Sequence, residues 1–162
     1  MTLEHAYYLS QIVAAVAVIA SLLYLGLQVN QTNKQARAQT RQAMMALAQA
    51  EITQFQNDPS IFATFTKDEP SWEDKVKLSQ WLSAAMRARE FEWFAHKNGT
   101  IDDDMFKAYS GMIPIILGTE RTRRWWAFRK DLGEFDPAFS TFVDGLLARS
   151  PLTEFWSSID KW

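Results

Sequence analysis

Residues 6–27 read AYYLSQIVAAVAVIASLLYLGL, a run that contains no charged side chain. As an α-helix this run extends about 33 Å at 1.5 Å per residue, enough to cross the hydrocarbon core of a bilayer. A cleaved signal peptide begins with a basic segment, but the residues before this run are Met-Thr-Leu-Glu-His. A buried helix of a soluble protein is the other alternative, although uncharged runs of this length are uncommon there. We therefore predict a retained transmembrane helix over residues 6–27.

The charges on either side of this run predict its orientation. After Glu4 the next acidic residue is Glu51, and the only Lys and Arg residues between them are Lys34, Arg37 and Arg41. Positively charged flanks stay on the cytoplasmic side of a membrane. We expect an inner-membrane protein with a short external N-terminus over residues 1–5 and a cytoplasmic C-terminal domain.

No Gly or Pro interrupts residues 28–57, and this stretch is rich in Ala, Gln, Met and Arg, which are good helix formers. The first stop signal is Asn57-Asp58-Pro59. We therefore expect the membrane helix to continue as a helical stalk over residues 28–57.

A heptad-like stripe follows this long helix. Its members are Ser10, Ala14, Ala17, Ser21, Tyr24, Gln28, Gln31, Gln35, Ala38, Gln42, Met45, Gln49 and Ile52. Small and hydroxylated residues let membrane helices approach closely, and Gln can hydrogen-bond to its equivalent on a neighbouring helix. Alternatively, Gln is simply a common helix former on a solvated face, and a Leu/Ile stripe would be a stronger signal. We interpret the stripe as a seam for self-association.

Residues 58–162 predict a compact bundle of about five helices. Ser71 caps a long helix with Asp74 at its third position, and Asn98-Gly99 ends it. Asp102 caps a helix that we expect Pro114 to kink and Gly118 to end.

Three further helices are expected downstream. One begins at Thr119, and one begins at Asp136-Pro137, an N-cap followed by proline at the first helical position. The last begins at Ser150-Pro151 and carries Phe155, Trp156, Ile159 and Trp162. No segment alternates with period two, so the predicted fold class is all-α.

Composition excludes several functions. The chain of 162 residues has no cysteine and a net charge of −2, which removes thiol chemistry and gives no basic excess for binding nucleic acid. Its histidines are His5 and His96, so no Ser-His-Asp arrangement is proposed, and the scattered glycines form no phosphate loop. We expect no cofactor and no catalytic residue.

Two clusters of polar residues are candidate sites. The basic one comprises Arg121, Arg123, Arg124, Trp125, Trp126 and Arg129. Guanidinium groups beside indoles suit phosphate or anionic headgroups, although these arginines do not share one helix face and could be solvated or paired instead. The other pair, Glu92 and His96, has metal-ligand spacing, but the second histidine that a di-metal site requires is missing. We expect no metal.

The layout resembles a widespread group of uncharacterised bacterial proteins that have an N-terminal anchor and a small helical cytoplasmic domain. The matching residues are Leu23-Tyr24-Leu25 with Gln28-Val29 and Gln31, then Gly99-Thr100-Ile101-Asp102, Arg124-Trp125-Trp126, and Asp136-Pro137 with Phe139, Phe142, Val143 and Asp144. The resemblance implies the same architecture and carries no assigned activity.

Together these patterns predict a membrane-anchored interaction or scaffold protein. Its expected partners are membrane lipid and either further copies of itself or the subunits of a membrane complex. The alternative is a homo-oligomeric pore, in which Ser10, Gln11, Ser21 and Gln28 line a lumen.

Overall fold

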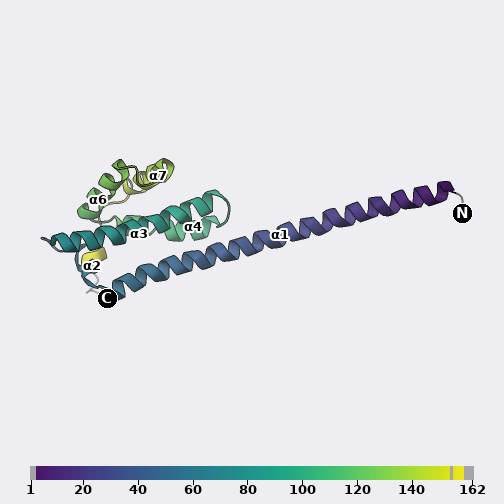
Figure 1. The fold of residues 1–162 in the computed structure, drawn as a ribbon. Coiled ribbons are helices and arrows are strands. Elements are labelled where there is room, and N and C mark those ends of the chain that lie inside the picture. The colour runs from purple at the N-terminus through teal and green to yellow at the C-terminus, as the bar shows by residue number, and fades with distance from the viewer. Residues whose placement is uncertain (1–2, 154, 159–162) are drawn as a thin grey trace. The chain divides into compact units, whose positions relative to one another are not determined.

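The structure, a computed structural model, describes residues 3–153 and 155–158, and within them all regular secondary structure is helical, with no strand. The helices are α1 (Leu3–Asn57), α2 (Ser60–Ala63), α3 (Trp72–Lys97), α4 (Asp103–Ser110), α5 (Ile113–Ile116), α6 (Glu120–Asp131) and α7 (Pro137–Leu147), followed by the 3₁₀ turn η1 (Phe155–Ser157) (Figure 1). The predicted all-α class is confirmed. So is a long apolar helix at the N-terminus, which runs without interruption for 55 residues.

The chain divides between Gln39 and Thr40 into two units. The first is the N-terminal part of α1, and every side chain described from residue 7 to residue 39 is exposed. The second contains the rest of α1 together with all later helices. This division falls earlier than the boundary that we expected at residue 57, because the last turns of α1 pack within the second unit.

One face of α1 makes that packing. Thr40, Met44, Ala48, Glu51 and Phe55 recur every three or four residues and are the positions of this stretch that are at least partly buried. Met44 is fully buried against a small cluster comprising Ala95, Ile101, Met105, Phe106 and Tyr109. Farther along, the ring of Phe55 lies 4.5 Å from that of Trp81. The end of α1 is therefore part of the domain's core.

The central helix of the second unit is α3. Its buried side chains include Leu78, Trp81, Leu82, Ala85 and Met86. These pack in one cluster with residues of the later helices and of η1, notably Ile113, Leu117, Trp126, Phe139, Val143 and Trp156.

The helix caps form as the sequence predicts. The Ser71 hydroxyl accepts from the Asp74 amide at 3.1 Å, and the Asp74 carboxylate accepts from the Ser71 amide at 2.9 Å. Asp102 caps α4, and Asp136 accepts from the first amides of α7. After α3, Gly99 has φ +68°, the left-handed conformation that glycine adopts most readily.

The prediction of one kinked helix from Asp102 to Gly118 is wrong. Instead α4 ends at Ser110, and α5 starts at Ile113 with Pro114 in its first turn. Proline has no amide hydrogen, and its ring clashes with the carbonyl four residues earlier, which here belongs to Ser110. The helix therefore ends at Ser110 and restarts around the proline.

The prediction of a helix from Ser150-Pro151 is also wrong. Of residues 150–153 and 155–158, only the three of η1 are helical. The expected positions Ile159 and Trp162 lie outside the described residues. The carbonyls of Ser150 and Pro151 accept from the Arg123 guanidinium at 2.6 and 3.0 Å. The Thr153 amide donates to the Gly118 carbonyl at 2.9 Å. These polar groups bind distant partners and do not start a helix.

Adjacent methionines on α1 test the packing of its last turns. We expect Met44→Ala to lower the free energy of unfolding of the detergent-solubilised full chain by about 2–5 kcal/mol, since it leaves a cavity. Met45 is 67% exposed, so Met45→Ala is the matched control and should cost less than about 0.5 kcal/mol. Denaturant unfolding followed by tryptophan fluorescence measures both. Equal losses would mean that this face of α1 is not packed.

Candidate functional site

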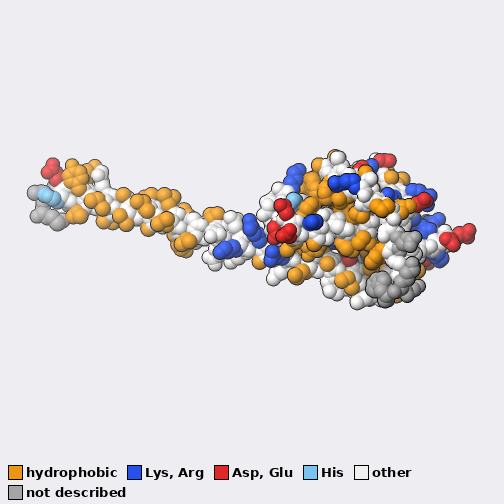
Figure 2. Space-filling model, turned by 180° about the vertical axis from the view of Figure 1, so that it is seen from behind, with side chains coloured by type: hydrophobic (Ala, Val, Ile, Leu, Met, Phe, Trp, Pro, Cys, Tyr) orange, Lys and Arg blue, Asp and Glu red, His pale blue; other side chains and the backbone are white. Residues whose placement is uncertain are grey.

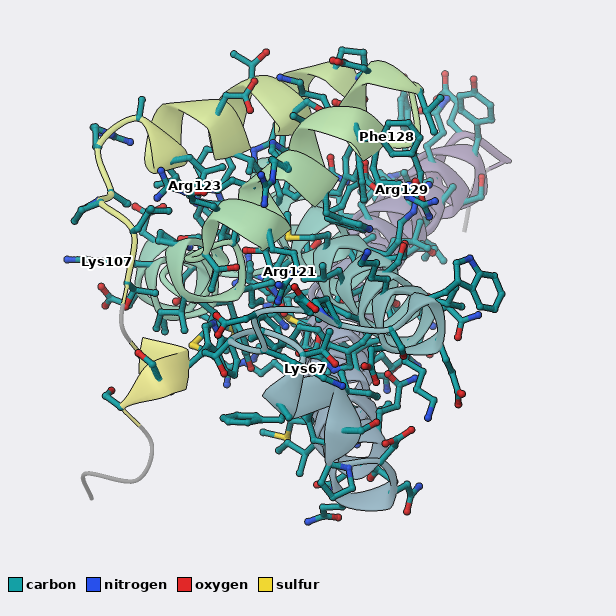
Figure 3. The ribbon with its side chains drawn as sticks, turned by 90° about the vertical axis from the view of Figure 1, so that its left-hand side faces the viewer. Lys67, Lys107, Arg121, Arg123, Phe128 and Arg129 are labelled. Carbon is teal, nitrogen blue, oxygen red and sulfur yellow. The ribbon has the colours of Figure 1, made fainter. Side chains whose placement is uncertain are left out.

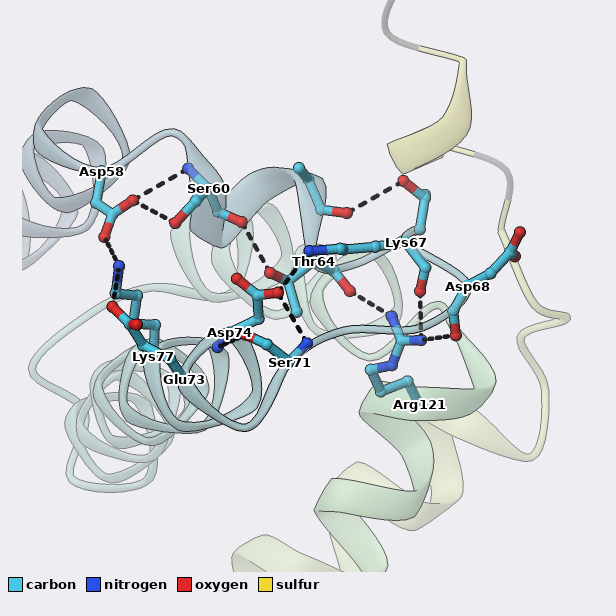
Figure 4. A network of polar contacts seen from close by, with 12 residues as sticks. Asp58, Ser60, Thr64, Lys67, Asp68, Ser71, Glu73, Asp74, Lys77 and Arg121 are labelled. Atoms are coloured by element: carbon cyan, nitrogen blue, oxygen red, sulfur yellow. Dashed lines mark hydrogen bonds and ion pairs between the residues drawn. The ribbon is translucent and has the colours of Figure 1, made fainter.

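The basic cluster on α6 is largely occupied by contacts within its own domain. The guanidinium of Arg121 donates to the backbone carbonyls of Thr64 and Lys67, the latter at 2.6 Å (Figure 4). It also reaches the carbonyls of Phe65 and Asp68 at 3.4 Å. These carbonyls follow α2, where the chain leaves its helix and its backbone acceptors lack partners of their own. Arg121 therefore fastens the loop between α2 and α3.

Ion pairs and hydrogen bonds at both ends of the segment around α2 also hold it to α3. The Asp58 carboxylate accepts from the Ser60 amide and from the Lys77 ammonium, at 3.1 and 2.9 Å (Figure 4). The hydrogen bonds from Ser60, then that from Lys77, hold the pKa of Asp58 below its usual value. At the start of α3, the ammonium of Lys67 lies 2.7 Å from the Asp74 carboxylate. Its hydrogen bond, with those from Ser71, lowers the pKa of Asp74 to about 2.

The other two arginines of α6 that Figure 3 labels, Arg123 and Arg129, also bind groups within the domain. Arg123 binds the carbonyls of Leu117, Ser150 and Pro151, which fixes the segment after α7. Arg129 donates to the Ser83 hydroxyl at 2.8 Å, and it is ion-paired with Glu134.

The two indoles of the cluster also bind inside the domain. Trp125 Nε1 donates to Ser79 Oγ and Trp126 Nε1 to Asp144 Oδ1, each at 2.9 Å. Arg124, by contrast, is exposed. Most polar atoms of the cluster thus form hydrogen bonds that join helices and loops of the domain. An anionic partner that bound Arg121, Arg123 or Arg129 would have to displace those hydrogen bonds.

The residues of the predicted seam are all exposed along α1: Ser10, Ala14, Ala17, Ser21, Gln28, Gln31, Gln35 and Gln42. The hydroxyls of Ser10 and Ser21 donate to carbonyls of their own helix, those of Tyr7 at 2.7 Å and Ala17 at 2.8 Å. Hydrophobic side chains gather along the N-terminal part of this helix (Figure 2). Within the described part of the chain, α1 is the one helix long and apolar enough to cross a membrane, and none of its most apolar window is buried.

A buried ionic centre lies where α1, α3 and α4 meet. The Arg89 guanidinium is 3.0 Å from a carboxylate oxygen of Glu92 on the same helix and 3.2 Å from one of Glu51 on α1. The side chains of Arg89, Glu92 and Glu51 are only 4%, 1% and 18% exposed. The ring of Tyr109 from α4 faces the guanidinium at 5.8 Å. We call these residues the Arg89 centre.

Burial shifts both carboxyls of the Arg89 centre in one direction. Loss of solvation raises the pKa of Glu92 to about 7, although Arg89 opposes the shift and the charge of Glu51 adds to it. Loss of solvation likewise raises the pKa of Glu51 against the opposing effect of Arg89. Removing a carboxylate from water disfavours its charged form, so the charge of Glu92 is sensitive to pH near neutrality.

The Arg89 centre replaces the Glu92–His96 pair considered from the sequence. His96 turns to Asp103, 2.7 Å away, and stacks on the ring of Phe106 at 4.2 Å between centroids. Among residues 3–153 and 155–158 no group of three or more His, Asp and Glu side chains could hold a metal ion.

An open groove of about 410 Å³ runs along α3 beside α6, lined by residues that include Trp72, Val76, Ser83 and Arg129. Trp72 is 79% exposed, and Phe128 of α6 and Leu132 directly after it are 62% and 63% exposed. The groove offers hydroxyls and apolar surface, without a buried acid or base of the kind found at the Arg89 centre.

The sequence contained half of the signal for the Arg89 centre. Leu78, Leu82, Ala85, Arg89 and Glu92 follow one another at intervals of three or four residues, so the two charged residues continue the apolar face of α3. Charged residues in such a stripe indicate a buried pair. Glu51 lies on another helix, and no local pattern connects it with them.

Comparisons with protein-family models, with characterised proteins and with solved structures gave no match for this chain. The resemblance to the anchored bacterial group therefore stays a prediction.

Arg121 and Arg124, one helical turn apart, test what the basic cluster does. We expect Arg121→Ala to destabilise the domain by about 1.5–3 kcal/mol and to speed trypsin cleavage after Lys67, because charged hydrogen bonds to the loop are lost. Arg121→Lys should restore little, since a single ammonium cannot reproduce the guanidinium fork. Arg124→Ala is the control, with less than about 0.5 kcal/mol of change. Unchanged cleavage in Arg121→Ala would leave this arginine free for an external partner.

Proposed function

We propose that this protein is a membrane-anchored interaction or scaffold protein. Its first α1 segment, residues 6–27, spans the inner membrane, and its helical domain lies in the cytoplasm. It self-associates or serves as an accessory subunit of a membrane complex, with membrane lipid as its other partner and no nucleic acid.

The observation that carries the proposal is the wholly exposed apolar part of α1. Side chains such as Ile12, Val16, Ile19, Leu22 and Leu23 are each more than half exposed. Leaving one such side chain in water instead of burying it costs about 1.5–3 kcal/mol. A helix that carries many of them requires an apolar surrounding, and its length matches a bilayer core.

The charges beside this segment support the proposed orientation. Lys34, Arg37 and Arg41 follow the segment and Glu4 precedes it, the asymmetry that keeps the C-terminal side in the cytoplasm. The domain itself has no cysteine, which is compatible with a reducing compartment.

The absence of charge from the seam positions of α1 supports self-association. Copies anchored in one membrane face each other in parallel, so each residue of a seam meets its own equivalent and a charge there would repel itself. Of the three basic residues that follow the apolar segment, only Arg37 lies opposite the seam, about 160° round the helix from Gln35. Lys34 and Arg41 directly precede the seam residues Gln35 and Gln42 and lie at its edge. The seam residues are uncharged throughout, and all are exposed.

A pore formed by several copies of α1 is the alternative function of a self-associated protein. It requires Ser10 and Ser21 to line water, whereas both hydroxyls donate to carbonyls of their own helix, as is usual where a polar side chain faces lipid or another helix. Of the other two expected lumen residues, Gln28 belongs equally to the seam, and Gln11 donates to the Tyr7 hydroxyl at 2.9 Å, so the scaffold is the function that we propose.

Because the chain has no cysteine, single introduced cysteines report its orientation. In intact bacterial cells we expect Glu4→Cys to react with a membrane-impermeant maleimide and Asp68→Cys to react only after the cells are permeabilised. A protein released by carbonate washing, or labelled at position 68 from outside, would contradict the proposed anchor or its orientation.

Charges placed in the seam test self-association. We expect the double variant Gln31→Lys/Gln35→Lys to shift the nanodisc-held protein from oligomer to monomer, because like charges meet across the seam. Asn33→Lys adds a charge about 160° away from Gln35 and should leave the oligomer intact. Mass photometry at several concentrations measures the state. A wild-type chain that is monomeric and carries no co-purifying subunit would exclude the scaffold.

A further inference from the structure

The Arg89 centre is unbalanced in charge. A guanidinium stays protonated at all accessible pH values, so one positive charge faces the two carboxyls of Glu51 and Glu92. No described residue hydrogen-bonds to either oxygen of Glu92, whose approach to Arg89 is an ion pair by distance only. Buried charges that are incompletely paired are costly. The centre can become neutral if one carboxyl takes up a proton.

Of the two carboxyls, Glu92 is the better proton acceptor. It is 1% exposed, and it belongs to the same helix as Arg89, whereas Glu51 is 18% exposed and reaches Arg89 from α1. With Glu92 neutral, the remaining Arg89–Glu51 pair is balanced and joins α1 to α3. With Glu92 ionised, two carboxylates compete for one guanidinium.

We propose that Glu92 is a proton-binding site that controls how firmly the last turns of α1 are seated on α3. Proton binding leaves the Arg89–Glu51 pair to join the two helices. Proton loss divides Arg89 between two carboxylates and favours hydration of the centre, which requires residues 44–55 of α1 to open. The seating therefore loosens as the pH rises through neutrality.

The other ionisable groups nearby come from each helix around the centre. Besides Glu51, α1 contributes Arg41, whose guanidinium lies 3.7 Å from the Asp102 carboxylate at the start of α4. Beyond Glu92 on α3, His96 pairs with Asp103. The Tyr109 phenol of α4 faces Arg89. Arg41, Asp102 and Asp103 are more than half exposed, in contrast to the residues of the Arg89 centre.

The direction of the effect follows from linkage. The seated form holds the Glu92 proton up to a pKa of about 7, and an opened form releases it near the ordinary value of 4.5. Opening is therefore favoured increasingly as pH rises between these values and levels off above them. For this pair of values, the opening equilibrium grows about tenfold between pH 6 and pH 8.

Hydrogen exchange of the full chain in nanodiscs measures this equilibrium. We expect protection factors of peptides covering residues 40–57, corrected for intrinsic exchange, to fall about tenfold from pH 6 to pH 8. Glu92→Gln should be protected equally at both values. Glu73→Gln is the matched control, because this carboxylate of α3 is 73% exposed, and it should behave as the wild type.

A second variant covers the case in which Glu92→Gln does not fold. Glu51→Gln leaves one carboxylate for Arg89, so the midpoint of the change should move to lower pH. The wild type alone also decides the matter. Carbon-13 spectra of labelled glutamates should contain one carboxyl that titrates near pH 7. A pH-independent protection factor over residues 40–57 in the wild type, or an unaltered pH response in Glu92→Gln, would overturn the proposal.

Discussion

The domain depends on the burial of α3, which needs cover that α3 and the later helices do not provide alone. Part of that cover comes from the last turns of α1. Met44 fills a pocket beside Ala95 and Ile101, and Phe55 packs on Trp81. Glu51 reaches the buried Arg89 between them. One helix thus contributes an apolar exposed segment at its start and core residues of a folded domain at its end.

Arginine plays a consistent structural role in this small domain. The non-helical segments of the domain, after α2 and after α7, contain backbone carbonyls that accept no hydrogen bond within a helix. Arg121 and Arg123, both on α6, bind those carbonyls and hold the two segments against the same helix. A guanidinium suits this task because its donors form a planar fork that bridges neighbouring acceptors. A basic cluster in a sequence can therefore indicate hydrogen bonds within the domain as well as binding of an external anion.

The Arg89 centre differs from these arginines in its chemistry. Arg121 and Arg123 meet neutral backbone carbonyls. Arg89 meets two carboxyls in a largely buried site, and burial raises the pKa of Glu92 to about 7. Among the described residues, the most buried charges of the domain thus lie at the junction between α1 and α3.

Features that depend on neighbours within about one helical turn can be predicted from the amino-acid sequence. The caps at Ser71, Asp102 and Asp136, the stop at Gly99 and the long apolar helix follow from such local rules, and the structure contains each of them. At Pro114 the same local pattern allowed either a kinked helix or a break, and the structure contains the break. Three features required the tertiary structure: the partners of Arg121, the place of Glu51 beside Arg89, and the start of the domain within α1. Those contacts join residues tens of positions apart, and their energy depends on burial that exists only once the helices have packed.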